Sequence, residues 1–99
     1  MVDPMTSTTP GTRATADTVT VRYFAAAKAA AGRTEEQLLL PDPAELGALL
    51  DRLRGAHGEV LSAVLQRCSY LIDEVAAHDG GAQLRPGAVV DVLPPFAGG

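Results

Sequence analysis

Residues 18–24 have the sequence TVTVRYF, in which β-branched and aromatic residues dominate and side-chain character alternates. This pattern is typical of a strand with one buried face, since successive side chains of a strand point to opposite sides of the sheet. Alternation assigns one set of residues to the core, Val19, Val21 and Tyr23, and the other set to the outside, Thr20, Arg22 and Phe24. We therefore expect the folded domain to begin with this strand.

The segment before this strand, residues 1–17, has the sequence MVDPMTSTTPGTRATAD. It offers almost no large apolar side chain that could anchor it to a core. We expect a disordered N-terminal extension over residues 1–17 and a single domain over residues 18–99. The sequence leaves open whether Met1 or Met5 is the true start.

Two short elements are predicted directly after the first strand. Residues 25–31 are alanine-rich, with Lys28 in their middle, and Gly32 suits the left-handed conformation that closes a helix. Residues 35–40, EEQLLL, run up to Pro41 and favour an extended segment. The sequence thus predicts a short helix, followed by a second strand that pairs with the first.

The main helix is predicted to begin at residues 42–45, DPAE. Asp42 at the N-cap, a proline at the first helical position and a glutamate at the third are close to a capping box. The leucines that follow are three or four positions apart and gather on one face: Leu46, Leu49, Leu50 and Leu53. Gly55 and Gly58 are expected to interrupt this helix, and residues 59–65 to form a short second one.

The C-terminal part of the domain predicts two further strands. Residues 69–72 are a short strand candidate, and residues 79–81 predict a turn. Residues 88–93, AVVDVL, form the clearer strand, which Pro94-Pro95 ends because proline cannot donate to a sheet ladder. Alternation points Val90 and Val92 inward, and Asp91 and Leu93 outward. The order of elements predicts an α+β fold, a mixed sheet with one main helix packed across a face.

Composition narrows the class of function. The chain has 99 residues, of which 46% are hydrophobic and 20% are charged, as expected of one globular domain. Its formal net charge of −4 disfavours nucleic acid or an anionic membrane as a partner. No apolar run is long enough to span a membrane, and the N-terminus lacks the features of a signal peptide, so we expect a cytoplasmic protein.

No set of side chains in the sequence predicts a metal site or an enzyme active site. Cys68 is the only cysteine, and His57 and His78 are dispersed, so zinc-ligand spacing is missing; Cys68 is expected to be a buried thiol. His57 is interpreted as a polar residue at a helix end. Asp73 and Glu74 would point to opposite faces of a strand and are expected to begin a solvated loop rather than to act as an acid/base pair.

The sequence PPFAGG, residues 94–99, is the candidate functional element. Glycine has no Cβ, so Gly98 and Gly99 can thread a narrow channel of a partner. Pro94 and Pro95 stiffen the base of the tail and lower the entropy lost when the tail is held. A carboxylate at Gly99 is a poor acyl donor until a phosphate leaving group is attached, so we expect the tail to be the substrate of an activating enzyme. The strand and Pro-Pro before it favour this interpretation over a frayed end or a cloning remnant.

Residues near both ends of the domain, together with the tail, resemble one known family. They are Val21 to Phe24 with Lys28 and Gly32, then Leu84, Pro86-Gly87, Val90 and Val92-Leu93, and finally Pro94-Pro95-Phe96-Ala97-Gly98-Gly99. In these residues the chain resembles the small sulfur-carrier subunit of molybdopterin synthase. The resemblance covers residues 18–99 and implies a β-grasp, ubiquitin-like fold and a non-catalytic carrier that binds no cofactor itself.

The resemblance also implies a reaction sequence for the tail. A ubiquitin-activating-type adenylyltransferase would use ATP to adenylate Gly99, and the acyl adenylate would become a thiocarboxylate. The large catalytic subunit of molybdopterin synthase would then use that sulfur to build the dithiolene of molybdopterin. The implied fold sets the first and last strands side by side, which would place Phe24 and Leu93 as apolar residues on a polar face near the tail. We predict that they form a partner interface, which Phe96 extends; Arg22 and Lys28 either meet acidic groups of the partner or are solvated.

Departures from the family pattern keep alternatives open. Asp73 stands where the family often has asparagine, Ala88 stands where an acidic residue is common, and the loop of residues 74–83 differs. One alternative is a sulfur carrier for thiamine, cysteine or another sulfur metabolite. A second is a ubiquitin-like modifier that joins Gly99 to lysines of target proteins, and a third is a binding module with an inert tail.

Overall fold

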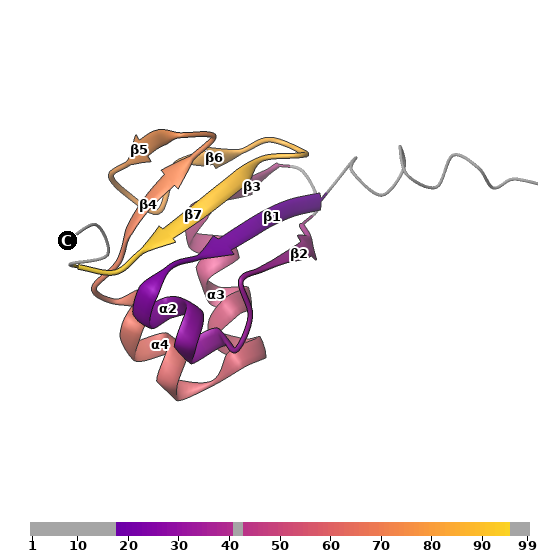
Figure 1. Cartoon of the computed structure of the whole chain (residues 1–99). Helices are drawn as coiled ribbons and strands as arrows, with labels where there is room; N and C mark the ends of the chain where they lie inside the picture. Colours follow the sequence, from indigo (N-terminus) through magenta and orange to yellow (C-terminus); the bar gives the residue numbers. More distant parts are fainter. Residues whose placement is uncertain (1–17, 41–42, 96–99) are drawn as a thin grey trace, which may run out of the picture.

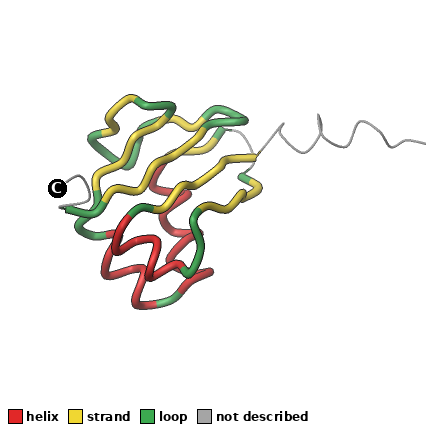
Figure 2. The backbone as a smooth tube through the Cα atoms, viewed as in Figure 1, coloured by secondary structure: helices red, strands yellow, loops and turns green. Residues whose placement is uncertain are grey.

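The computed structural model describes residues 18–40 and 43–95. The helices and strands are β1 Thr18–Tyr23, α2 Ala25–Ala31, β2 Glu35–Leu39, β3 Ala44–Glu45, α3 Leu46–His57, α4 Glu59–Leu65, β4 Ser69–Ile72, β5 Val75–Ala77, β6 Gln83–Leu84 and β7 Val89–Leu93. Five strands form one sheet in the order β2-β1-β7-β4-β5, and β3 pairs with β6 in a separate two-stranded sheet. The helices gather on one side of the five-stranded sheet (Figures 1 and 2). The α+β prediction is confirmed.

The centre of the sheet is the parallel pair of β1 and β7. Val21 lies opposite Val90 and Tyr23 opposite Val92, while β2 and β4 flank the pair in antiparallel orientation. Parallel neighbours need a long crossover, and here most of the domain lies between the two strands in sequence. The first and last strands of the domain therefore end at the same edge of the sheet (Figure 1).

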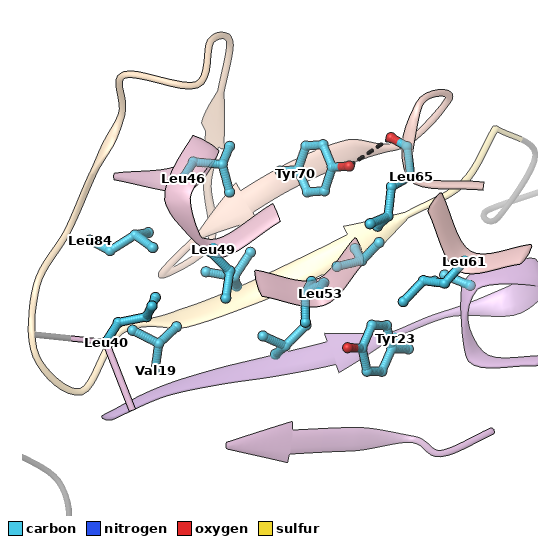
Figure 3. Close-up of a cluster of buried hydrophobic side chains, with 14 of the residues drawn as sticks. Val19, Tyr23, Leu40, Leu46, Leu49, Leu53, Leu61, Leu65, Tyr70 and Leu84 are labelled. Carbon is cyan, nitrogen blue, oxygen red and sulfur yellow. Dashed lines mark hydrogen bonds between the residues drawn. The ribbon is translucent and has the colours of Figure 1, made fainter. Parts of the chain in front are cut away.

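The core lies between this sheet and the helices. Val19, Val21, Tyr23, Val90 and Val92 are buried on the inner face of the sheet, as their alternation predicts. The helices cover them with Ala27, Leu46, Leu49, Leu53, Leu61 and Leu65 (Figure 3). The predicted leucine face of the main helix is confirmed, with Leu50 packed at its margin. No helix in residues 18–40 and 43–95 is both long and apolar enough to cross a membrane.

The predicted start of the main helix is wrong. Ala44 and Glu45 form strand β3 opposite Leu84 and Gln83, and α3 begins at Leu46 with no side-chain cap. The first amides of the helix find backbone acceptors instead, because Leu46 N–H donates to Ala82 O and Gly47 N–H donates to Gly80 O, each at 2.9 Å. These carbonyls satisfy the donors that a capping side chain would otherwise take. Asp42, the expected N-cap, lies outside the described residues.

The predicted interruption at Gly55 is also wrong, because α3 continues through it to His57. The break falls at Gly58, whose φ of 86° and ψ of −161° belong to a region that glycine adopts readily. The predicted second helix follows as α4. The short helix before β2 ends as predicted at Gly32, which has a φ of 75° and donates its N–H to Lys28 O.

Asp73 and Glu74 close a hairpin that the sequence analysis missed. Both have positive φ, 49° and 71°, and they connect β4 to β5, with Ile72 opposite Val75. Two successive residues of positive φ match the twist of a tight β-hairpin. Asp73 is also fixed to β7, since its N–H donates to Val89 O at 2.8 Å and its Oδ1 accepts from Val89 N–H at 2.9 Å. The expectation of a simple solvated loop is therefore corrected.

Candidate functional site

The candidate site lies at the edge of the sheet where β1 and β7 end. Phe24 directly follows β1, and its N–H donates to Val92 O at 3.3 Å, which extends the parallel pairing to the last residues of both strands. Pro94 is buried and Pro95 is exposed, so the chain is packed against the domain up to the first proline and reaches solvent at the second. Phe96, Ala97, Gly98 and Gly99 lie outside the described residues.

Phe24 and Leu93 are each half-buried beside the end of the sheet. The Arg22 guanidinium carbon lies 5.4 Å from the centre of the Phe24 ring, which places both side chains on the outer face, away from the helices. Leu93 is opposite Ser69 of β4, in the same alternating set as Asp91. Their role as a partner interface remains a prediction.

An ion pair on the outer face was missed by the sequence analysis. Arg22 Nε lies 3.1 Å from Asp91 Oδ1, across the parallel β1 and β7, where the two residues are opposite each other. Asp91 was expected to face outward, and it does, but it is only 8% exposed. The parallel pairing implied by the resemblance was the available signal, because it sets opposite charges on adjacent strands side by side.

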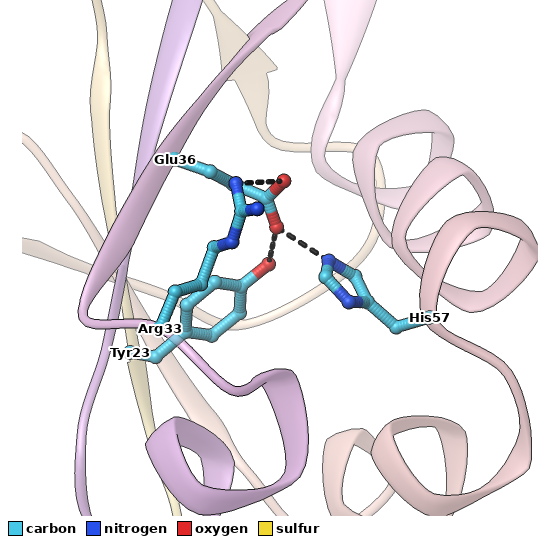
Figure 4. Close-up of polar contacts among 4 residues, drawn as sticks. All are labelled: Tyr23, Arg33, Glu36 and His57. Atoms are coloured by element: carbon cyan, nitrogen blue, oxygen red, sulfur yellow. Dashed lines mark hydrogen bonds and ion pairs between the residues drawn. The ribbon is translucent and has the colours of Figure 1, made fainter.

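A polar cluster on the inner face joins three elements (Figure 4). Tyr23 OH donates to Glu36 Oε2 at 2.5 Å, and His57 Nε2 lies 2.5 Å from the same oxygen. Arg33 Nη1 lies 3.5 Å from the other oxygen of this carboxylate. His57 is therefore more than a polar residue at a helix end, because it ties α3 to β2.

The cluster shifts the titration of its members. Burial by itself would raise the pKa of Glu36, but the hydrogen bonds from Tyr23 and His57, together with the electrostatic attraction of His57 and Arg33, outweigh it and lower this pKa below its ordinary value. Burial first, and then the bond to Glu36 and its charge, raise the pKa of Tyr23 well above the usual range. Glu36 is thus held as a carboxylate and Tyr23 as a neutral donor, which suits a structural role. We call the hydrogen-bonded group of Tyr23, Glu36 and His57 the clasp.

Cys68 lies half-buried at a hollow of about 400 Å³ whose lining also includes Leu50, Tyr70 and His78. Burial raises the pKa of its thiol to about 11, and Sγ donates to Val64 O at 3.2 Å. A thiol that stays protonated at neutral pH is a poor nucleophile. Across residues 18–40 and 43–95, no three His, Cys, Asp or Glu side chains come together as metal ligands.

Residues 21–99 match the model of the ThiS family, which covers the second half of β1, every later helix and strand of the described residues, and the Gly-Gly tail. The chain belongs to the ThiS family. It is therefore a small ubiquitin-like sulfur carrier, and the family match runs through Gly99. Among curated proteins, no match to the sequence was found.

Solved structures place the ThiS-family chain among β-grasp proteins. SAMP1 from Haloferax volcanii is 26% identical with a TM-score of 0.71, over 83% of this chain and 99% of that one. A protein named molybdopterin converting factor subunit 1 from Pyrococcus furiosus is 23% identical with a TM-score of 0.67, over 80% of this chain and 98% of that one. The complex of subunits 1 and 2 of the molybdopterin-converting factor from Helicobacter pylori contains a chain that is 24% identical with a TM-score of 0.63, over 83% and 99%. The predicted β-grasp fold is confirmed.

Proposed function

We propose that this ThiS-family protein carries sulfur for molybdopterin synthesis as a thiocarboxylate on Gly99. One observation carries the proposal: β7 runs beside β1 to Pro94-Pro95 at the edge of the sheet, and the family match extends beyond that point through Gly98 and Gly99. The choice of this acceptor pathway draws on the printed names of two structures of the same fold, molybdopterin converting factor subunit 1 and the complex of subunits 1 and 2.

The proposed conversion of the Gly99 carboxylate to a thiocarboxylate has two steps. The Gly99 carboxylate attacks the α-phosphorus of ATP on the activating enzyme, which forms an acyl adenylate and releases pyrophosphate. Hydrosulfide then adds to the acyl carbon and displaces AMP, which leaves a thiocarboxylate and releases a proton. The carrier contributes reach and fit, because glycine lets the last residues enter a narrow channel and Pro94-Pro95 limits the conformations to be frozen.

Two protein partners follow from this scheme. A ubiquitin-activating-type adenylyltransferase binds ATP and activates the tail, so the carrier needs no cofactor of its own. The large catalytic subunit of molybdopterin synthase accepts the sulfur. Phe24 and Leu93, beside the point where the chain leaves the sheet, are the proposed contacts with the large subunit, since half-buried apolar side chains suit a docking surface.

Reconstitution with purified partners tests this function. The protein is loaded with sulfur by the activating enzyme and ATP, repurified, and added to the large subunit with its precursor substrate. We expect molybdopterin to form in proportion to the thiocarboxylate supplied, and none to form from unloaded protein. Efficient loading of Gly99 with sulfur, without transfer to the large subunit, would instead assign the protein to another acceptor pathway, such as thiamine or cysteine synthesis.

A ubiquitin-like modifier is the second candidate, and a specific similarity favours it. SAMP1 from H. volcanii, a small archaeal modifier protein, is 26% identical to this chain. A modifier would transfer the activated Gly99 to lysine amines and form isopeptide bonds. High-mass conjugates in cells that disappear when Gly99 is deleted would support this candidate, and their absence under conditions of active loading would favour the carrier.

A further inference from the structure

The outer face of the sheet has a buried carboxylate at its centre. Strand registers place Arg22, Asp91 and Leu71 opposite one another across β1, β7 and β4. Asp91 occupies the middle of this row, and its side chain is only 12% exposed although the helices lie on the other side of the sheet (Figure 1). A charge withdrawn from water in this way is unfavourable unless other groups supply hydrogen bonds.

Asp91 is under-supplied with such partners within the described residues. Its contact with Arg22 brings Nε to 3.1 Å from Oδ1, yet this buried oxygen has no hydrogen bond, because the N–H does not point closely enough at it. A carboxylate oxygen can accept about two hydrogen bonds, and no described residue donates one to this oxygen, so the charge of Asp91 is incompletely compensated. Arg22 is shared with Phe24, whose ring lies under its guanidinium, and is itself 45% exposed at the side chain.

The same carboxylate lines a hollow of about 250 Å³. Its other walls are Arg22, Asp73, Glu74 and Val89. Asp73 is fixed at the rim by its two hydrogen bonds with the backbone of Val89, so its position does not depend on a flexible side chain alone. Three carboxylates face a single guanidinium here, and the hollow is therefore net negative.

We propose that this hollow receives a cationic side chain, an arginine or a lysine, from a protein partner that docks on the outer face. Because Oδ1 of Asp91 is shielded from solvent, an incoming guanidinium or ammonium would be attracted by the Asp91 carboxylate across the hollow rather than donate to Oδ1 itself, and Asp73 and Glu74 at the rim add favourable charge. Phe24 and Leu93 are two residues further along β1 and β7 than Arg22 and Asp91. In the proposed complex they supply the apolar border that excludes water from the contact. The fitting partner thus presents a basic residue beside an apolar cluster.

The identity of the partner rests on the proposed function, since it would be one of the proteins that handle the tail. The preference of the hollow for a cation is independent of the proposed function, because it follows from the charged residues that line the hollow. The experiment therefore has two arms, one without any partner and one with the tail-handling enzymes.

In the first arm, the full-length ¹⁵N-labelled protein is titrated with methylguanidinium and its amide shifts are followed by NMR. We expect saturable shifts centred on Asp73, Val89 and Asp91, which Asp91→Asn abolishes and Glu59→Gln on α4 preserves. Should Asp91→Asn misfold, Asp73→Asn serves instead and is expected to weaken the shifts, because asparagine keeps the acceptor for Val89 N–H and tolerates positive φ. Shifts spread evenly over surface carboxylates, or unchanged by Asp91→Asn, would overturn the proposal.

In the second arm, binding to the activating enzyme and to the large synthase subunit is measured over a range of salt concentrations. Asp91→Asn is expected to raise the Kd for at least one of them by about tenfold or more and to flatten its salt dependence. Glu59→Gln carries the same change in net charge and is expected to alter Kd by less than about twofold. Unchanged binding of Asp91→Asn to an enzyme that binds the wild type would refute the cation contact there. If the wild type binds neither enzyme and is never loaded with sulfur, the proposed function is wrong. The methylguanidinium titration still tests whether the hollow binds a cation.

Discussion

The hydroxyl of Tyr23 donates a 2.5 Å hydrogen bond to Oε2 of Glu36, which joins β1 to β2 on the helix-covered face of the sheet. The same oxygen also meets His57 at the end of α3, so one carboxylate links two strands and the main helix (Figure 4). Tyr23 belongs to the strand that carries Phe24 to the edge of the sheet. These hydrogen bonds therefore hold the end of β1, where Tyr23 lies opposite Val92 of β7.

Removing the Tyr23 hydroxyl tests this clasp. Tyr23→Phe keeps the packed ring but deprives a largely buried carboxylate of one donor, so we expect the free energy of unfolding to fall by about 1–2 kcal/mol. Urea unfolding at neutral pH measures the change. Glu35→Gln, at the exposed neighbouring position of β2, is the control and is expected to stay within about 0.5 kcal/mol of the parent. A Tyr23→Phe protein as stable as the parent would show that the bond contributes nothing net.

The lowered pKa of Glu36 predicts an acid-sensitive contribution to stability. Because the folded state holds this carboxylate ionised more firmly than the unfolded chain does, the contribution is fully present above the ordinary pKa of 4.5. It is lost as the pH falls from there through the lowered folded value. The difference in unfolding free energy between wild type and Glu36→Gln should therefore be constant near neutrality and shrink in acid. A difference that is independent of pH from neutrality to about pH 3 would argue against an ionised clasp.

Phe24 and Leu93 are predicted to contact the large subunit. Phe24→Asp or Leu93→Asp should weaken this association by at least about tenfold, because each places an unpaired charge in an apolar contact. Circular dichroism should show an intact fold. Val60→Asp, at a 68% exposed position of α4, is the matched control and should bind as the parent does. Unaltered affinity of both test variants would remove the docking surface.

The N-terminal segment is predicted to be dispensable. Deleting residues 1–17 should leave the melting temperature and sulfur transfer nearly unchanged, since the segment lacks large apolar anchors. A drop of several degrees, or a loss of transfer, would assign it a structural or functional role.

The parts of the fold that the sequence predicted are those with a local signal. Alternation over residues 18–24 and 88–93 located the two central strands and their buried faces, and leucine spacing located α3. The closing of α2 at Gly32 followed from the ability of glycine to adopt positive φ.

The errors arose where distant backbone groups outcompeted a local motif. The DPAE motif resembles a capping box, but pairing of Ala44 with Leu84 and the carbonyls of Gly80 and Ala82 moved the helix start to Leu46. The β4–β5 hairpin was missed because Asp73 and Glu74 adopt positive φ without a glycine to signal it.

For the candidate site, too, local sequence motifs could be predicted and contacts between distant residues could not. The Gly-Gly tail is a sequence motif and was recognised as such, whereas the polar clusters exist only after folding. Glu36 on β2 and His57 at the end of α3 are far apart in sequence and meet only in the folded chain. Arg22 and Asp91 become partners only through the parallel register of β1 and β7.

The central claim is that Gly99 accepts sulfur, and the intact mass of the protein after co-expression with the activating enzyme tests it most directly. We expect the parent to gain the mass difference between sulfur and oxygen, and proteins that lack Gly99 or carry one added residue beyond it to gain none, because either change misplaces the carboxylate relative to ATP. All three should melt alike, within about 0.5 kcal/mol in unfolding free energy, since the change lies beyond Pro94-Pro95 in the sequence and the core residues of the described chain end at Val92. A protein without Gly99 that still acquires sulfur at its new terminus and supports molybdopterin synthesis would contradict the carrier account.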